Sequence, residues 1–125
     1  SPDELRSGAP HWSHLITPQL HIVDYLKRDA GLQEKLRSQG ITAELVAPTA
    51  GIYKGMSTLV ATGEDPLERA TLRPQVAHHL RLTLSRGSRR SGFPGSPMGA
   101  VALARQAMLD AQWYGEAWQA HRTQA

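Results

Sequence analysis

Residues 40–62 read GITAELVAPTAGIYKGMSTLVAT, and this stretch decides the fold. Apolar and β-branched residues run over 41–47 and again over 56–62, with Gly or Pro at the borders of each run. Both runs therefore predict short strands. Residues 49–55, between them, contain two glycines and predict a loop, and residues 63–66 predict a turn.

Two short helices are expected upstream of these strands. The dipeptide Thr-Pro at 17–18 is a typical helix start and predicts a helix over about 18–28. A second helix over about 31–39 would use Leu32 and Leu36 as apolar contacts and end at a glycine cap. A helix, a glycine and then an apolar strand form the αβ half of a βαβ unit, so the expected fold class is α/β.

Downstream, the pattern predicts one more strand, a loop and a long helix. Residues 76–84 alternate and predict a half-buried strand. Its inward side chains would be Val76, His78, Leu80 and Leu82. Residues 85–95 are rich in Ser, Gly and Arg and predict a loop, and Ser-Pro at 96–97 starts a helix expected over about 97–121.

The long helix is apolar on two sides. One stripe comprises Met98, Val101, Ala102, Leu109 and Trp113. The other comprises Leu103, Ala107, Tyr114 and Trp118. A helix with two apolar sides needs two partners, which indicates missing sequence or an oligomer. Arg105 lies within the first stripe, where either its guanidinium reaches water while its stem packs, or it is buried and points toward a site.

Composition bounds the class of protein. The 125 residues suffice for one small domain, but only 6% are aromatic, so the core is expected to be thin. The absence of cysteine excludes disulfides and thiolate metal sites. No apolar run approaches the roughly 20 residues of a membrane span, so no membrane partner is expected.

The net charge of +3 is unevenly distributed, because no Asp or Glu lies between Arg69 and Asp110. One hypothesis is a small basic module that binds nucleic acid or an acidic partner through Arg73–Arg90. The other is a solvated loop whose acidic partners lie elsewhere in a longer protein. The second is favoured, and nucleic acid is the less favoured partner, because no aromatic stacking platform accompanies these arginines.

The histidines do not form a ligand set. His11 and His14 are three residues apart, but Pro10 argues against a helix there and no third ligand is near, so a loop or packing role is favoured. His78 and His79 would point to opposite sides of one strand. They could not chelate one ion together, and His78 is expected to face the core with a backbone partner.

Two further features were weighed as sites. Glu44 interrupts an apolar strand; it would either point into a barrel interior, where it needs a partner, or belong to a polar face packed on helices or at an edge. The segment 51–55 (GIYKG) lacks the glycine pattern of a nucleotide loop, and a turn with glycine at positive φ explains it more simply. No catalytic, cofactor-binding or metal-binding residue is therefore assigned.

An ordered set of blocks resembles the imidazolonepropionase-like members of the amidohydrolase superfamily. The blocks are HW (11–12), ITPQ (16–19), GIT (40–42), LVAP (45–48), GIYKGMS (51–57), GFPGSPMG (92–99), ARQ (104–106) and LDAQWY (109–114). Their order and spacing over most of the chain carry the resemblance, and no single block is diagnostic. Pro97 departs from the Leu or Arg that commonly follows the serine.

This resemblance implies a metal-dependent hydrolase of non-peptide C–N bonds, built on a (β/α)8 barrel. Such enzymes use one or two divalent ions to turn water into hydroxide. The family's His-x-His ligand pair is absent here; by order it would precede Ser1, and later ligands would follow Ala125. A zinc-like ion is thus expected in the parent enzyme, and none of the family's catalytic residues can be placed on this chain.

The chain is therefore expected to be one fragment of an amidohydrolase domain, namely a partial barrel segment of mixed short strands and helices ending in one long helix. Its expected parts are an extended lead-in (1–17), a helix-helix-strand-strand region (18–62), a strand and basic loop (63–95), and the long helix (96–125). Its expected partners are the rest of the parent chain and, alternatively, a second copy.

Overall fold

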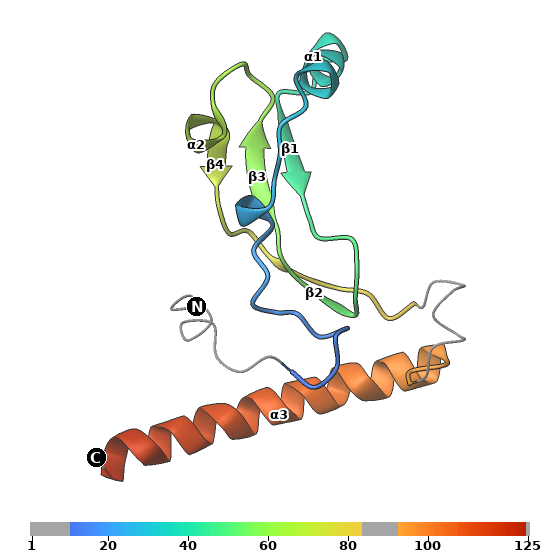
Figure 1. The fold of residues 1–125 in the computed structure, drawn as a ribbon, viewed down its shortest axis with the longest axis vertical. Coiled ribbons are helices and arrows are strands. Elements are labelled where there is room, and N and C mark those ends of the chain that lie inside the picture. The colour runs from blue at the N-terminus through green and yellow to red at the C-terminus, as the bar shows by residue number, and fades with distance from the viewer. Residues whose placement is uncertain (1–10, 84–92, 125) are drawn as a thin grey trace. The chain divides into compact units, whose positions relative to one another are not determined.

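The computed structural model describes residues 11–83 and 93–124, which belong to two compact units, one ending at Leu80 and the other beginning at Arg81 (Figure 1). The start of the expected lead-in and most of the expected arginine-rich loop lie outside the described residues. The elements are a 3-10 turn (Ile22–Asp24), α1 (Ala30–Ser38), β1 (Ala43–Val46), β2 (Tyr53–Met56), β3 (Thr58–Ala61), α2 (Leu67–Ala70), β4 (Thr71–Arg73), β5 (His78–Leu80) and α3 (Pro97–Gln124).

The first unit contains two small antiparallel sheets, one with the order β1-β3-β4 and one that pairs β2 with β5. The mixed α/β class is confirmed at this level. The expected βαβ arrangement is wrong, because β1 and β3 pair antiparallel and no helix connects them. Parallel neighbours need a crossover, usually a helix, whereas β2 and its loops fill this connection. No barrel is present among the described residues.

The two predicted upstream helices have different outcomes. The helix expected over 31–39 is confirmed as α1, whose first turn is capped by the Asp29 carboxylate. The chain leaves α1 through Gly40 at φ 82°. The helix expected over 18–28 is wrong apart from the 3-10 turn, because the backbone there bonds to a distant segment. The Leu20 carbonyl, for example, accepts the Met56 N–H at 2.8 Å.

Strand β3 forms the centre of the larger sheet. Val60 is 1% exposed, and two buried threonines on the same face donate side-chain hydrogen bonds to neighbouring chain segments. The Thr58 hydroxyl donates to the Arg73 carbonyl at 3.0 Å, and the Thr62 hydroxyl donates to the Ile41 carbonyl at 2.8 Å. The buried hydroxyls are thereby satisfied and hold both flanking segments against β3.

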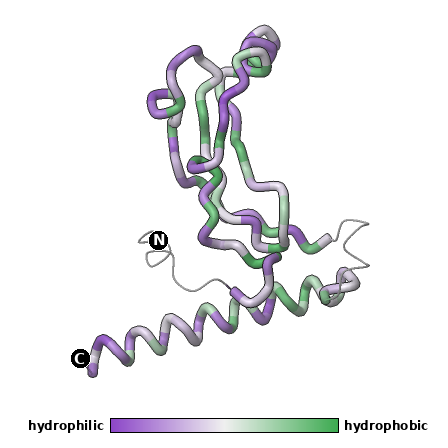
Figure 2. Tube along the Cα trace, viewed as in Figure 1, coloured by the Kyte–Doolittle hydropathy of each residue, from purple (hydrophilic) through white to green (hydrophobic). Residues whose placement is uncertain are grey.

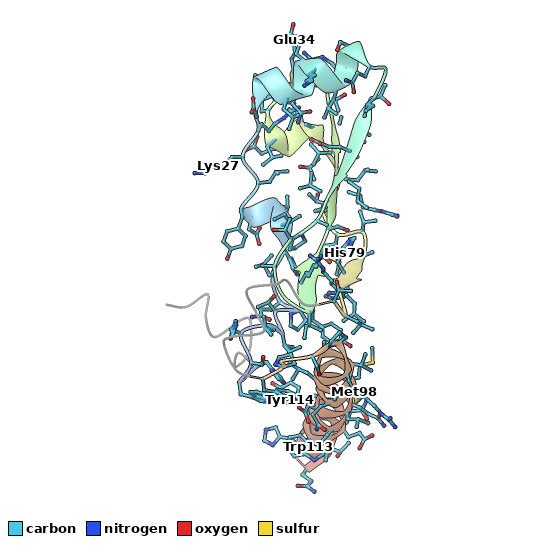
Figure 3. The ribbon with its side chains drawn as sticks, turned by 90° about the vertical axis from the view of Figure 1, so that its right-hand side faces the viewer. Lys27, Glu34, His79, Met98, Trp113 and Tyr114 are labelled. Atoms are coloured by element: carbon cyan, nitrogen blue, oxygen red, sulfur yellow. The ribbon has the colours of Figure 1, made fainter. Side chains whose placement is uncertain are left out.

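The strand expected over 76–84 is shorter than predicted and presents the opposite side. β5 covers three residues, His78 is exposed, and the half-buried histidine is His79 (Figure 3). Val76 and Leu80 are 40% and 44% exposed, and Leu82 is 39% exposed. The inward assignment of His78 is therefore wrong. Within the described residues β5 pairs with β2 alone, so both are edge strands of a two-stranded sheet.

In the second unit, the predicted long helix is confirmed as α3. The Ser96 hydroxyl caps its first turn by accepting the Gly99 N–H at 3.1 Å. A Cβ at Gly99 would lie 3.1 Å from Pro94 Cβ, so glycine permits a close turn before the helix. The buried stripe consists of Ala100, Leu103, Ala104 and Ala107. Figure 2 shows α3 more hydrophobic in its first half than at its C-terminal end. Within the described chain, no helix has the length and apolarity to cross a membrane.

Candidate functional site

The histidines lie in separate places. The His11 ring accepts the Ser13 N–H through Nδ1 at 3.1 Å and lies 5.1 Å from the Trp12 ring, so it belongs to a local turn. In residues 11–83 and 93–124, no three side chains of the ligating types are close enough together to hold a metal ion. The divalent ion that the family resemblance implies therefore does not fit the residues described here.

Glu44 lies on a polar face that packs against a helix. The buried Gln33 of α1 donates its side-chain N–H to Glu44 Oε1 at 2.7 Å. This matches one of the two alternatives for Glu44 and ties α1 to β1. Glu44 and Gln33 also line a hollow of about 130 Å³. Gln33 Oε1 is buried there with no hydrogen-bond partner among the described residues.

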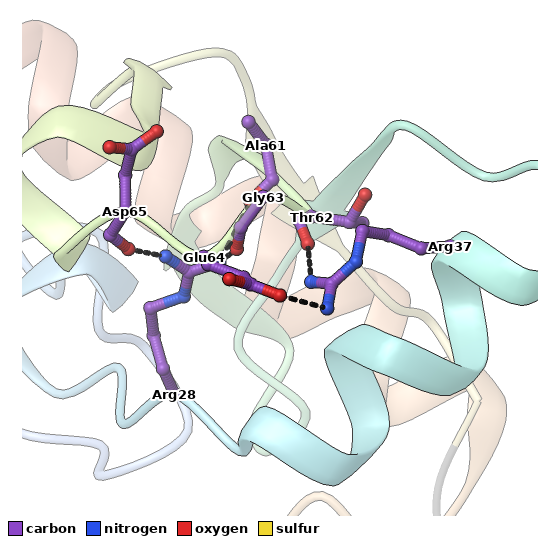
Figure 4. Close-up of polar contacts among 7 residues, drawn as sticks. All are labelled: Arg28, Arg37, Ala61, Thr62, Gly63, Glu64 and Asp65. Atoms are coloured by element: carbon purple, nitrogen blue, oxygen red, sulfur yellow. Dashed lines mark hydrogen bonds and ion pairs between the residues drawn. The ribbon is translucent and has the colours of Figure 1, made fainter.

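Two arginines brace the turn that follows β3 (Figure 4). The Arg28 guanidinium donates to the carbonyls of Ala61 at 3.1 Å, Gly63 at 2.6 Å and Asp65. Arg37 donates to the Thr62 carbonyl and pairs with the exposed Glu64 at 3.3 Å.

These arginines line a cleft of about 400 Å³. Four of the five hydrogen bonds that these guanidinium groups make within the described residues go to backbone carbonyls, which offset part of the positive charge and occupy donors that could bind an anion. The arginines of this cleft therefore have a structural role, because they hold the turn after β3 in place. Sequence reasoning missed both arginines, because their partners are main-chain atoms that no side-chain pattern reveals.

A groove between residues 14–25 and residues 48–54 is the candidate functional site, and we call it the lead-in groove. Its volume is about 360 Å³, within the usual range for small-ligand sites. Leu15, Leu20 and Ile22 contribute apolar surface, while His14 and Lys54 contribute basic groups. No carboxylate lines it among the described residues, so its electrostatic character favours a small anion with an apolar body.

The groove is held by hydrogen bonds between two distant segments. The Leu15 carbonyl accepts the N–H groups of Ile52 and Tyr53 at 2.8 and 3.1 Å. The Tyr53 carbonyl accepts both the N–H and the hydroxyl of Thr17 at 2.9 Å. Burial raises the pKa of the Tyr53 phenol above its ordinary value.

The expectation for segment 51–55 is confirmed in one respect and wrong in another. Gly51 and Gly55 have φ values of 94° and 107°, as expected for glycines at positive φ. The segment is not simply a loop, however, because Tyr53–Met56 form β2 and pair with β5. The register of this pairing shifts between Tyr53 and Gly55.

The remaining basic candidates that the structure describes lie at the surface. Arg105 is exposed on α3, so the hypothesis of a buried arginine is wrong. Arg73 and Arg81 are also exposed, and Arg81 Nε donates locally to the Thr83 hydroxyl at 2.8 Å. The other arginines of the Arg73–Arg90 stretch lie outside the described residues. Comparison with family models, curated proteins and solved structures finds no match to this chain.

Proposed function

We propose that this chain is scaffold from a metal-dependent amidohydrolase of the imidazolonepropionase-like kind, an enzyme that hydrolyses non-peptide C–N bonds. The observation that carries the proposal is the way two of the family-like blocks fit together. ITPQ (16–19) and GIYKGMS (51–57) are distant in sequence, yet their backbones join through a parallel bridge between Ile16 and Tyr53 and a hydrogen bond from the Thr17 N–H to the Tyr53 carbonyl. Just beyond the first block, His21 forms a second parallel bridge with Met56.

The glycines of the second block are the residues that this fit requires. A Cβ on Gly55 would lie 2.2 Å from the Leu20 carbonyl oxygen, and one on Gly51 would lie 3.0 Å from the Leu15 carbonyl oxygen. In GFPGSPMG, likewise, Gly99 and Ser96 make the close turn and the helix cap. The resemblance thus coincides with positions where backbone geometry restricts the residue, as a shared scaffold would.

The exposed apolar surface supports the rest of a parent chain as partner. Eight hydrophobic residues form the described core, and half of them are alanines. In contrast, seventeen large hydrophobic side chains are exposed among the described residues, including Trp12, Tyr25 and Leu45 of the first unit at 70%, 69% and 51%. Exposed apolar patches on this scale mark surfaces that other protein covers.

In the parent enzyme, this chain, whose strands pair antiparallel, would lie beside the parallel-stranded barrel and form part of the mouth of the substrate site. One or two zinc-like ions would supply the hydroxide nucleophile, held by residues outside this chain. The lead-in groove, with Lys54 and His14 at an apolar surface, would hold a carboxylate-bearing part of a substrate by charge.

The test is to sequence the gene on both sides of this segment and to express the complete product. We expect a His-x-His pair upstream, further ligand-type histidines downstream, bound divalent metal, and hydrolysis of cyclic amides or N-acyl amino acids. The control is the same product with both histidines of the pair replaced by alanine, which should lose metal and activity together. Flanking sequence too short for a barrel, or without ligand-type histidines, refutes the proposal.

A separate assay addresses the basic-module alternative, since Arg73 and Arg81 are exposed. Fluorescence anisotropy with a random DNA duplex would be measured at about 50 and 200 mM salt, where phosphate-driven binding falls by orders of magnitude. No binding, or binding that ignores salt, removes the alternative. Tight salt-sensitive binding would favour it over the amidohydrolase proposal.

A further inference from the structure

Helix α3 carries an exposed apolar face opposite its buried stripe. Met98, Val101 and Leu109 are 82%, 49% and 53% exposed, and Trp113 on the edge of this face is 69% exposed. Figure 3 labels Met98 and Trp113 on α3. At 100° per residue these positions lie on the side of α3 away from Leu103 and Ala107. We call this surface the outer face.

Two opposite charges lie at the centre of the outer face. Arg105 and Glu116 are about three helical turns apart, so they point in nearly the same direction. Both are exposed. Arg105 makes no hydrogen bond or ion pair within the described chain, while Glu116 accepts one from Gln112 of the preceding turn at 3.1 Å. Their separation along the helix places them symmetrically about its middle, between Asp110 and Ala111.

We propose that the outer face binds a second copy of this chain as an antiparallel helix pair. A two-fold axis at the middle of α3 brings Arg105 of each copy to Glu116 of the other, which gives two ion pairs at the centre of the contact. The same axis places Leu109 of both copies beside the dyad. Trp113 of both copies then lies along one edge of the contact.

The charges select this orientation. In a parallel pair in register, Arg105 would meet Arg105 and Glu116 would meet Glu116, which is repulsive at both places. The contact can run along α3, whose 28 residues span about 42 Å. The inference is independent of the amidohydrolase proposal, since it uses only residues of α3.

The experiment is sedimentation equilibrium of the 125-residue chain between about 1 and 100 μM at low salt. Four proteins are compared: the wild type, Arg105→Glu, Glu116→Arg and the double swap Arg105→Glu/Glu116→Arg. Glu34→Arg, an equally large charge change on the exposed surface of α1, is the matched control. Circular dichroism at 222 nm checks that each variant keeps its helix.

We expect a dimer for the wild type and the Glu34→Arg control. Each single reversal should raise the dissociation constant at least about tenfold, because two attractive pairs become repulsive. The double swap restores both pairs with inverted sign and should return the dissociation constant to within about threefold of the wild type. A monomer at 100 μM, single variants that match the wild type, or a double swap that fails to recover would each overturn the proposal.

Discussion

Replacing Gly55 with alanine should be the most damaging small substitution in the first unit. The added Cβ would lie 2.2 Å from the Leu20 carbonyl oxygen and 3.0 Å from Leu20 Cβ, at a backbone φ of 107°. The added Cβ would overlap both the backbone and the side chain of Leu20, so no rotamer change relieves the overlap. The segment around Leu20 must move away, and the hydrogen bond from the Met56 N–H to the Leu20 carbonyl is lost.

The cost can be estimated from its parts. A positive φ costs an alanine about 1–2 kcal/mol, and losing the hydrogen bond while leaving its groups poorly solvated costs about 1–3 kcal/mol. The expected loss is therefore about 2–5 kcal/mol before any relaxation of the lead-in, against a total of about 5–15 kcal/mol for an ordinary domain. With a core this thin, much of the unit should unfold.

Gly40→Ala provides the matched control, because Gly40 also has a positive φ, of 82°, but a Cβ there meets nothing within 4 Å. It should cost only the conformational part, about 1–2 kcal/mol. Urea unfolding would be followed through the amide NMR signals of β1 and β3, since α3 dominates circular dichroism. If both variants lose the same stability, the close approach at Gly55 is not what holds the lead-in.

Three other changes probe the brace, the polar pair and the buried phenol. Arg28→Met should lower the free energy of unfolding by about 2–3 kcal/mol, because three backbone carbonyls lose their donor. Arg28→Lys should recover less than half of this loss. Equal urea midpoints for the wild type and Arg28→Met would contradict a stabilising role of Arg28. Glu44→Ala should cost about 1–3 kcal/mol by leaving the Gln33 amide unsatisfied, whereas the double change Gln33→Leu/Glu44→Leu should be nearly neutral; a double-mutant cycle with no coupling would exclude their interaction. Burial raises the pKa of the Tyr53 phenol, so the unfolded chain loses this proton at a lower pH than the folded chain does. The contribution of Tyr53 to the free energy of unfolding should be complete below the ordinary phenol pKa of 10.0 and should decline as pH rises through the raised value. Tyr53→Phe should reduce that decline, and an unchanged dependence of the free energy of unfolding on alkaline pH would count against the burial of the phenol.

Elements with their own local signals could be predicted from the sequence. α3 has a Ser-Pro start, and α1 has a glycine after its last turn. β1 and β3 were predicted because apolar runs bordered by Gly or Pro specify strands without help from the rest of the chain. The orientation of their pairing was predicted wrongly, because the helix before β1 indicated a parallel unit, whereas β1 and β3 pair antiparallel.

Elements decided by distant partners could not be predicted. The Thr-Pro start at 17–18 lost its helix because the segment bonds to the strand around Tyr53. The inward side of β5 was predicted wrongly. The chain just before β5 exchanges hydrogen bonds through Val76 and Ala77 with Ser57, which is not a neighbour in sequence. The short α2 and β4 were missed because four and three residues are too few for a periodicity to register.

The candidate site shows the same division. Lys54 and His14 were each considered from the sequence, but nothing in their spacing predicts that they line one groove. Glu44 was singled out as an anomaly in an apolar strand, and its partner Gln33 was not, because a polar residue on a helix gives no sign of burial. The arginine brace left no signal beyond two ordinary basic residues near the ends of α1.

The strand pairings of the first unit have a consequence for how the chain folds. Between the named strands the most distant partners are Tyr53 and Leu80, while an isolated bridge reaches from Ile16 to Tyr53. The entropy cost of closing such loops grows only slowly with their length. The strands β1, β3 and β4 precede α3 in the chain and are therefore synthesised first. The exposed edge of β1 and its side chain Leu45 then lie in water until a partner covers them.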